Sequence, residues 1–373
     1  MVSASEFSRY SRHLSLPGFG IEGQEKLKAA RVLVVGAGGL GCPLLQYLAA
    51  AGIGTIGIID HDIVSLSNLQ RQVLFSVRDI GKKKVEVARE KLHDLNPIVI
   101  INAYPVKLDA GNALSLFAEY DIIADCSDNF PTRYLVNDAA VLSGMPYVYG
   151  SVFRFEGQLA VFNYQESGGY RSANYRDLYP QPPLPGEVPN CEQAGVLGVS
   201  TGIIGTMQAL MILKLLTGMD SADKNVYHMF DAVTMEFKSM QFHPRPDNPL
   251  TGDNPSIFGL QDYELFCGLK QSTGNEVRQI TGRELLRLRE SNTQFQLIDV
   301  REKSEYEQFN IGGTHIPLAA IADNISLIRK DIPVIIHCHS GQRSMEAIER
   351  LQSEFKFNNL MNLAGGIAGL NDE

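Results

Sequence analysis

The sequence has 373 residues, enough for two domains of ordinary size. Its 42 acidic residues outnumber its 33 lysine and arginine residues, which gives a formal net charge of −9. This balance argues against a nucleic-acid partner, because binding a phosphate backbone broadly requires a basic face. With 44% hydrophobic and 20% charged residues, the composition is that of a soluble globular protein.

The sequence favours a cytoplasmic protein with no membrane partner. Residues 1–16 carry polar and charged side chains throughout and lack the apolar core of a signal peptide. The most apolar stretch, residues 201–216, is shorter than a bilayer span and contains Lys214, so we expect a buried helix. The 5 cysteines are odd in number and scattered, which is not typical of a secreted disulfide framework.

Short apolar runs alternate with helical patterns from residue 31 onward. Strands are predicted at residues 31–35, 55–60, 98–103, 121–125 and 146–151, and helices at 39–51, at 82–95 and from Pro131. This alternation predicts parallel βαβ units, and hence an α/β fold with a Rossmann-like, mostly parallel sheet and helices on both faces. Residues 152–163 also have strand character.

A second, smaller α/β pattern occupies the C-terminal part of the chain. Helices are predicted at residues 281–290 and 341–352, and strands at 295–300 and 333–337. The segment before them, residues 243–276, is rich in proline, glycine and asparagine and predicts a linker. We therefore expect a first domain at residues 1–244, a linker at 245–275 and a second domain at 276–373.

Gly36, Gly38 and Gly41 form a G-x-G-x-x-G pattern between a predicted strand and a predicted helix. Glycines allow a sharp turn and a close approach to phosphate, and the helix N-terminus offers free N–H groups. Asp60, at the end of the next strand, is placed to accept hydrogen bonds from ribose hydroxyls. The pattern predicts a nucleotide site without choosing between NAD and ATP. The alternative is that the glycines bind no nucleotide and serve only the close packing of the helix on the sheet.

Polar residues downstream of Asp60 favour a triphosphate. Asn68, Arg71 and Lys84 supply an amide and two cations, which suit a triphosphate and its departing pyrophosphate. The alternative is that residues 82–84 form a solvated first helical turn. Asp128 follows another predicted strand and can hold Mg²⁺ through its oxygens, or cap the helix near Pro131.

An ordered set of motifs resembles the MoeB/ThiF/HesA family, which comprises molybdopterin-synthase adenylyltransferases and their thiamine-pathway relatives, related to ubiquitin-activating enzymes. The motifs are residues 9–13, 36–41, 67–71, 128–129 and 190–198. The resemblance implies a homodimer that binds ATP and Mg²⁺ and adenylates the C-terminal glycine of a ubiquitin-like sulfur-carrier protein ending in Gly-Gly. Arg12 is then an arginine finger for the partner subunit's ATP. The implied binding residues are Gly36, Gly38, Gly39, Gly41, Asp60, Asn68, Arg71, Lys84, Asp128 and Asn129.

The sequence departs from this family at the positions of its structural zinc. Family members usually hold the metal with two C-x-x-C pairs. The corresponding positions are Asn174, Asp177, Asn248 and Thr251. Asparagine and threonine side chains are poor zinc ligands, so we expect no zinc, with the loop held by packing or hydrogen bonds.

Residues 297–301 with Glu305, and residues 338–344, resemble a single rhodanese domain. Cys338 lies between a predicted strand and helix, where backbone N–H groups favour a thiolate or persulfide anion. Four residues separate Cys338 from Arg343, one fewer than in the C-x₅-R loop of tyrosine phosphatases. This spacing disfavours phosphatase activity, and the intact cysteine disfavours a catalytically dead docking domain.

The family motif makes Cys191 a candidate for a thioester or disulfide with the activated carrier, and a small buried hydrophobe is the alternative. The hypothesis is adenylation followed by sulfur transfer, with Cys191, Cys338, Arg12, Arg71 and Asp128 as the catalytic residues. The sulfur would come from a cysteine desulfurase or another sulfane-sulfur donor. Molybdenum cofactor, thiamine, tRNA thiolation and cysteine pathways all use such chemistry. An NAD-binding oxidoreductase and a noncatalytic carrier-binding scaffold are the rival hypotheses.

Overall fold

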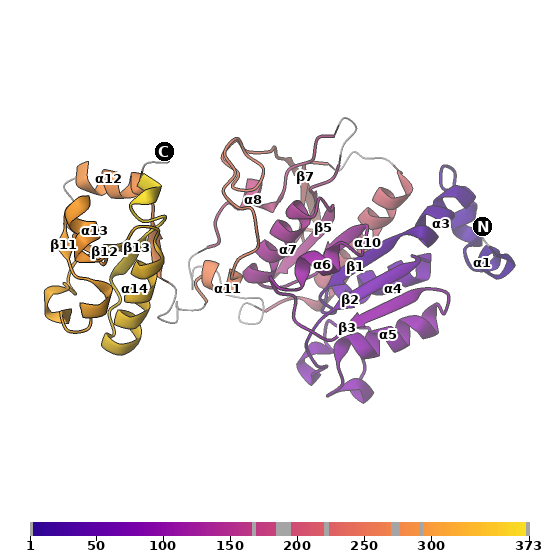
Figure 1. Ribbon diagram of the computed structural model, residues 1–373. Helices are drawn as coiled ribbons and strands as arrows, with labels where there is room; N and C mark the ends of the chain where they lie inside the picture. The colour runs from indigo at the N-terminus through magenta and orange to yellow at the C-terminus, as the bar shows by residue number, and fades with distance from the viewer. Residues whose placement is uncertain are drawn as a thin grey trace. The chain divides into compact units, whose positions relative to one another are not determined.

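The computed structural model describes residues 3–165, 169–183, 195–219, 224–269, 277–290 and 294–370 (Figure 1). The chain divides into two compact units, Met1–Leu269 and Lys270–Glu373. Each unit has its own sheet and its own hydrophobic core.

The first unit contains an eight-stranded sheet with the order β3-β2-β1-β4-β5-β6-β7-β8. Strands β1 to β5 pair in parallel, and β5 to β8 pair antiparallel. The predicted Rossmann-like sheet is confirmed. The strands are β1 (Arg31–Val35), β2 (Thr55–Ile59), β3 (Ile100–Tyr104), β4 (Ile122–Asp125), β5 (Tyr147–Phe153), β6 (Glu156–Phe162), β7 (Val226–Asp231) and β8 (Glu236–Gln241).

Helices cover both faces of this sheet (Figure 1). Along β1, Val32 packs into one core and Leu33 into the other, because successive side chains of a strand point to opposite faces. The helices are α1 (Ala4–Arg9), α2 (Ser11–Leu14), α3 (Gly20–Ala29), α4 (Gly41–Ala51), α5 (Lys84–Leu95), α6 (Ala113–Phe117), α7 (Phe130–Leu142), α8 (Tyr175–Leu178), α10 (Gly198–Thr217) and α11 (Tyr263–Phe266), with 3₁₀ turns η1 (Leu66–Asn68) and η2 (Val77–Asp79).

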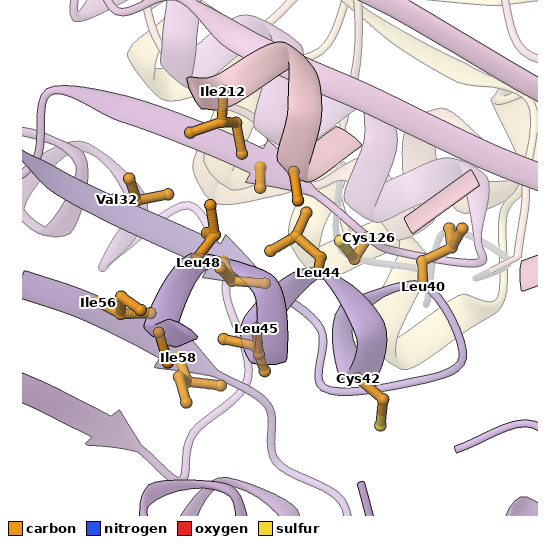
Figure 2. Close-up of a cluster of buried hydrophobic side chains, with 14 of the residues drawn as sticks. Val32, Leu40, Cys42, Leu44, Leu45, Leu48, Ile56, Ile58, Cys126 and Ile212 are labelled. Atoms are coloured by element: carbon orange, nitrogen blue, oxygen red, sulfur yellow. The ribbon is translucent and has the colours of Figure 1, made fainter. Parts of the chain in front are cut away.

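Helix α10 is 20 residues long and has a mean hydropathy of 1.6, so its length and composition alone would allow it to cross a membrane. In this fold it packs against α4, β5 and β6, and Ile204 and Ala209 are buried in the first core. Figure 2 shows Ile212 of the same helix in this core. It is therefore a core helix, as the sequence predicted.

The antiparallel half of the sheet was not fully predicted. The strand character of residues 152–163 is confirmed, but β5 ends at Phe153 and a turn precedes β6. Arg154 in this turn has a positive φ of 55°, which lets the chain reverse direction. Strands β7 and β8 were not predicted. Strand β8 is exposed along its whole length, so its sequence shows no alternation between a buried and an exposed face.

The expected linker at residues 245–275 is wrong over residues 245–269, which pack onto the first unit. Asn248 is 1% exposed, and Cys267 is buried in the core beside α7. The hydroxyl of Tyr263 donates to Asp138 Oδ2 at 2.8 Å. The same carboxylate binds Arg176 through two hydrogen bonds of 2.7 Å. Prolines mark this segment as irregular, but its buried side chains fix it to the domain.

The second unit contains a five-stranded parallel sheet with the order β11-β10-β12-β13-β9. Cores on its two faces include Ile348 of α14 and Leu285 of α12. The elements are β9 (Arg278–Ile280), α12 (Gly282–Glu290), β10 (Gln296–Asp299), α13 (Lys303–Gln308), β11 (Thr314–His315), β12 (Val334–His337), α14 (Gln342–Phe355) and β13 (Leu360–Leu363), with 3₁₀ turns η3 (Leu318–Ala320), η4 (Ile325–Leu327) and η5 (Ala368–Leu370).

Candidate functional site

The glycine loop joins β1 to α4 and is tightly enclosed. Gly36 has a φ of +98°, and a Cβ there would lie 2.9 Å from the carbonyl oxygen of Cys126. A Cβ on Gly41 would lie 2.1 Å from the carbonyl oxygen of Gly36. Side chains at both positions are sterically excluded, so the backbone can expose its N–H groups closely to a ligand. Gly39 lies against Thr201 of α10, and Gly38 lies beside Gln72.

Asp60 is fixed against this loop, immediately after β2. Its Oδ2 accepts a hydrogen bond of 2.8 Å from Ala37 N, and its Oδ1 accepts one of 2.8 Å from Asp62 N. Each carboxylate oxygen keeps a further lone pair for a ribose hydroxyl. The structure therefore brings Asp60 and the glycine loop together at the carboxyl edge of the sheet.

The predicted cations approach the same edge. Arg71 follows η1 and its Nη1 donates to the carbonyl oxygen of Ser67 at 3.3 Å. Lys84 begins α5, is 4% exposed, and forms an ion pair of 2.8 Å with Asp62, two residues beyond Asp60. Burial raises the pKa of Asp62, but the Lys84 ammonium lowers it, and the net shift is downward. Lys84 is thus an ordered cation rather than part of a solvated turn. Asn68 Oδ1 accepts from Ser65 N at 3.2 Å and holds the segment in shape.

Asn129, not Asp128, caps helix α7. The Asn129 side chain accepts a hydrogen bond of 3.0 Å from Thr132 N. Asp128 is exposed, and Asn129 Nδ2 approaches its Oδ1 at 3.4 Å. The capping alternative for Asp128 is therefore wrong. An exposed carboxylate that follows β4 fits the oxygen ligation that Mg²⁺ prefers.

Cys338 lies in the loop between β12 and α14 of the second unit and is 1% exposed. Its Sγ accepts hydrogen bonds from Gly341 N at 3.1 Å and from Ser344 Oγ at 3.5 Å. Burial raises the pKa of the Cys338 thiol, but the hydrogen bonds from Ser344, Ser340 and Gly341 outweigh it and lower that pKa overall. The loop therefore favours a sulfur anion.

Two arginine–carboxylate pairs lie in this part of the second unit. Arg343 donates to both oxygens of Glu305, at 2.6 and 2.8 Å, and so joins the start of α14 to α13. The second pair joins Arg301 to Asp299 at 2.7 Å and is buried. A cavity of about 480 Å³ beside the loop is lined by residues including Arg301, Glu305, Phe309, His339 and Ile367.

His337, directly before Cys338, is fully buried. Its Nε2 lies 4.0 Å from Asp299 Oδ2, a carboxylate that the sequence did not indicate. Burial lowers the pKa of His337 to about 4, so the imidazole is neutral at physiological pH.

Comparison with known proteins identifies both units. The ThiF family matches residues 10–250, and the rhodanese-like domain matches residues 281–373. The chain belongs to the ThiF family. It is 42% identical over 372 residues to the "Probable adenylyltransferase/sulfurtransferase MoeZ" of Mycobacterium tuberculosis, covering 98% of this chain and 93% of that protein. The resemblance stated from the motifs is confirmed.

Two further comparisons agree. The ThiF part is 48% identical over 265 residues to the "Sulfur carrier protein adenylyltransferase" of Thermus thermophilus, covering 71% of this chain and 98% of that protein. A crystal structure of E. coli MccB shares the fold with a TM-score of 0.57 and 23% identity, covering 66% of this chain and 74% of that one. The chain is an enzyme that pairs an ATP-using adenylyltransferase domain with a rhodanese-like sulfurtransferase domain. The oxidoreductase and scaffold hypotheses are therefore set aside.

No described contact joins two predicted catalytic residues of the ThiF domain to the carboxyl edge of the sheet, where the glycine loop and Asp60 lie. Arg12 is exposed on α2, and within the described ranges no hydrogen bond or ion pair engages its guanidinium. Cys191 falls in residues 184–194, outside the described residues. The segment after it is fixed, because Leu197 N donates to the carbonyl oxygen of Arg154 at 3.3 Å.

The four positions of the family's zinc ligands hydrogen-bond to one another, and we call this group the polar clasp (Asn174, Asp177, Asn248 and Thr251). Asn248 Nδ2 donates to Asp177 Oδ1 at 2.7 Å, and Asn174 Nδ2 donates to Thr251 Oγ1 at 3.1 Å. Asp177 Oδ2 accepts from Asn174 N at 2.7 Å. These bonds join the segment before the proline-rich loop to the end of the domain, the connection that a metal would otherwise make.

Because hydrogen bonds hold the polar clasp together, we predict that the stability of the domain does not depend on a bound metal. We expect EDTA to leave the melting temperature unchanged and elemental analysis to find no stoichiometric zinc. Asn248→Ala should destabilise the domain by about 1–3 kcal/mol, because it removes the bond to Asp177 and leaves Leu250 N and Thr251 N without their acceptor, Asn248 Oδ1. Asn254→Ala, at an exposed position nearby, is the matched control. A chelator-induced loss of stability would contradict the metal-free clasp.

The remaining cysteines of the ThiF domain pack in its interior. Figure 2 shows Cys42 and Cys126 among aliphatic side chains of the first core. Burial raises the pKa of Cys42 to about 12 and that of Cys267 to about 11, so neither thiol is nucleophilic at neutral pH. Cys267, which had no role in the sequence analysis, is thus a core residue.

Proposed function

We propose that the ThiF domain adenylates the C-terminal glycine of a ubiquitin-like sulfur-carrier protein ending in Gly-Gly, and that the rhodanese domain converts the product to a thiocarboxylate. The observation that carries the proposal is the bond between Asp60 and the glycine loop, together with the ion pair of buried Lys84 to nearby Asp62 and with exposed Asp128 after the neighbouring strand β4. The same chain carries a thiolate-stabilising loop at Cys338.

In the first reaction, the carrier's carboxylate attacks the α-phosphorus of ATP and pyrophosphate leaves. A carboxylate is otherwise a poor acyl donor because its leaving group would be oxide, and the mixed anhydride with AMP removes this obstacle. The glycine loop binds phosphate through backbone N–H groups, and Asp60 binds the ribose. Arg71 and Lys84 stabilise the charge on the departing pyrophosphate. Asp128 would hold the Mg²⁺ that accompanies ATP, which supplies further charge stabilisation.

In the second reaction, a Cys338 persulfide attacks the acyl-adenylate, AMP leaves, and an acyl disulfide joins the carrier to Cys338. The Cys191 thiolate then attacks the Cys338 sulfur. The thiocarboxylated carrier leaves with the transferred sulfur, and a Cys191–Cys338 disulfide remains. An external dithiol reduces this disulfide. A cysteine desulfurase, or another sulfane-sulfur donor, restores the persulfide. Because both domains belong to one chain, tethering raises the effective concentration of the persulfide.

The enzyme is proposed to act as a cytoplasmic homodimer, in which Arg12 reaches the phosphates of the partner subunit's ATP. Exposed Arg12 is consistent with such a role. Val199 and Leu210 are exposed apolar residues on α10, and partly buried Ile203 lies between them in the chain; this apolar surface supports burial against a second subunit. Exposed Leu66 and Val73, which flank the Arg71 segment, extend the apolar surface.

The proposal is tested by ATP–pyrophosphate exchange in the presence of candidate carrier proteins. We expect exchange that depends on a carrier ending in Gly-Gly, because only the carrier supplies the attacking carboxylate. A carrier lacking its terminal glycine is the control and should not support exchange. ATP binding without carrier-dependent exchange, across carriers from every sulfur-transfer pathway tried, would refute the proposed reaction.

A further inference from the structure

Gln72 is a buried polar residue whose side-chain oxygen has no hydrogen-bond partner among the described residues. It is 3% exposed, and its Oε1 is enclosed without a donor. Its backbone is well held: Gln72 N donates to the Asn68 carbonyl oxygen at 2.9 Å, and Phe75 N donates to the Gln72 carbonyl oxygen at 3.0 Å. The backbone of Gln72 is therefore held by hydrogen bonds, while its enclosed side-chain oxygen has none.

The amide of Gln72 lies at the glycine loop. Its Nε2 is 3.8 Å from the position that a Cβ on Gly38 would take. Gly38 directly follows Ala37, whose N–H is bound by Asp60. Gln72 also directly follows Arg71 in the chain. The amide thus lies against the glycine loop at Gly38, one residue after the loop residue that Asp60 binds.

An enclosed acceptor without a donor lowers the stability of the ligand-free protein, so its presence calls for an explanation. The missing partner must be a donor. Phosphate oxygens of a nucleotide are acceptors, whereas the ribose hydroxyls can donate and are bound beside Asp60. We propose that Gln72 is a further nucleotide-binding residue whose amide oxygen accepts a hydrogen bond from a ribose hydroxyl of ATP. This inference rests on the proposed adenylation function.

The test combines a protein variant with a substrate lacking the same hydrogen bond. Calorimetric titration of the full chain compares MgATP with the 2′-deoxy and 3′-deoxy analogues, for wild type and for Gln72→Met, which keeps the side-chain volume. Wild type should bind one deoxy analogue about tenfold more weakly than ATP. Gln72→Met should bind ATP about tenfold more weakly than wild type does. The variant should bind that deoxy analogue with the same affinity as ATP, because the contact that the analogue lacks is already absent. Gln241→Met, on exposed β8, is the matched control and should behave as wild type.

Thermal unfolding separates a ligand contact from a structural role. Without nucleotide, Gln72→Met should melt at the same or a higher temperature than wild type, because the unsatisfied acceptor is gone. With ATP, its thermal shift should be smaller. The proposal is overturned if the variant binds ATP as tightly as wild type, or if ATP and both deoxy analogues weaken equally. If wild type binds no ATP, both the proposed adenylation function and the role of Gln72 are refuted. If wild type binds ATP and Gln72→Met binds it equally well, only the role of Gln72 is refuted.

Discussion

Replacing Cys338 with alanine is expected to lower thiocarboxylate formation by more than about 10³-fold, because no other group replaces the nucleophile that carries the sulfur. Carrier-dependent ATP–pyrophosphate exchange should stay within about twofold of wild type, because adenylation uses residues of the other unit. Mass spectrometry of the carrier measures the first quantity, and radiolabelled pyrophosphate measures the second. Equal loss of both activities would refute the division of labour between the two units.

The same cysteine should also show an unusual dependence on pH. Because its pKa is lowered, Cys338 remains a thiolate at pH values where ordinary thiols are protonated, and it loses reactivity only as the pH falls through that lowered pKa. Alkylation by iodoacetamide, followed by peptide mapping, reports this directly. Ser344→Ala removes one hydrogen bond to the sulfur, so its profile should move to higher pH. Cys42 and Cys267, with raised pKa values, provide internal unreactive controls. An unchanged profile in the variant would show that Ser344 does not stabilise the thiolate.

The parallel half of the first sheet was predictable because its strands are short buried runs between helical patterns. The predicted strand at residues 31–35 matches β1 to the residue. Glycines at positions 36 and 41 were equally readable from the motif, since Gly36 adopts a φ of +98° and a side chain on Gly41 would meet the Gly36 carbonyl. These features depend on residues that are close in sequence, and a short segment carries their whole signal.

Features that depend on distant partners were not predictable. The segment at residues 245–269 resembles a linker in composition, and only its contacts show otherwise: Asn248 binds Asp177, and Tyr263 binds Asp138. Asn129 and Asp128 are both good capping residues, so the sequence could not show which one caps α7. Gln72 carried no signal at all, because a glutamine is usually a surface residue and only the fold reveals its burial.

Replacing Asp128 with alanine is expected to lower ATP–pyrophosphate exchange by at least about 10²-fold, because the proposed metal ligand is lost where charge develops on the leaving group. Folding should be unaffected, since Asp128 is exposed and Asn129 supplies the cap of α7. Asp94→Ala, at another exposed aspartate, is the matched control and should retain full exchange. Full exchange by Asp128→Ala would remove this residue from the catalytic site.

Asp128→Ala also provides a test of whether Arg12 acts across a subunit interface. Arg12→Ala should lose exchange by itself, because the arginine finger is missing. In a mixed dimer, the Asp128→Ala subunit still donates Arg12 to the intact metal site of the Arg12→Ala subunit. Unfolding and refolding an equimolar mixture should therefore restore about a quarter of wild-type activity, since half of the dimers are mixed and each has one complete site. If Arg12 acts within its own subunit, every site lacks one essential residue and no activity returns. Recovery thus requires both the dimer and the trans contact, and no rearrangement within one chain can imitate it.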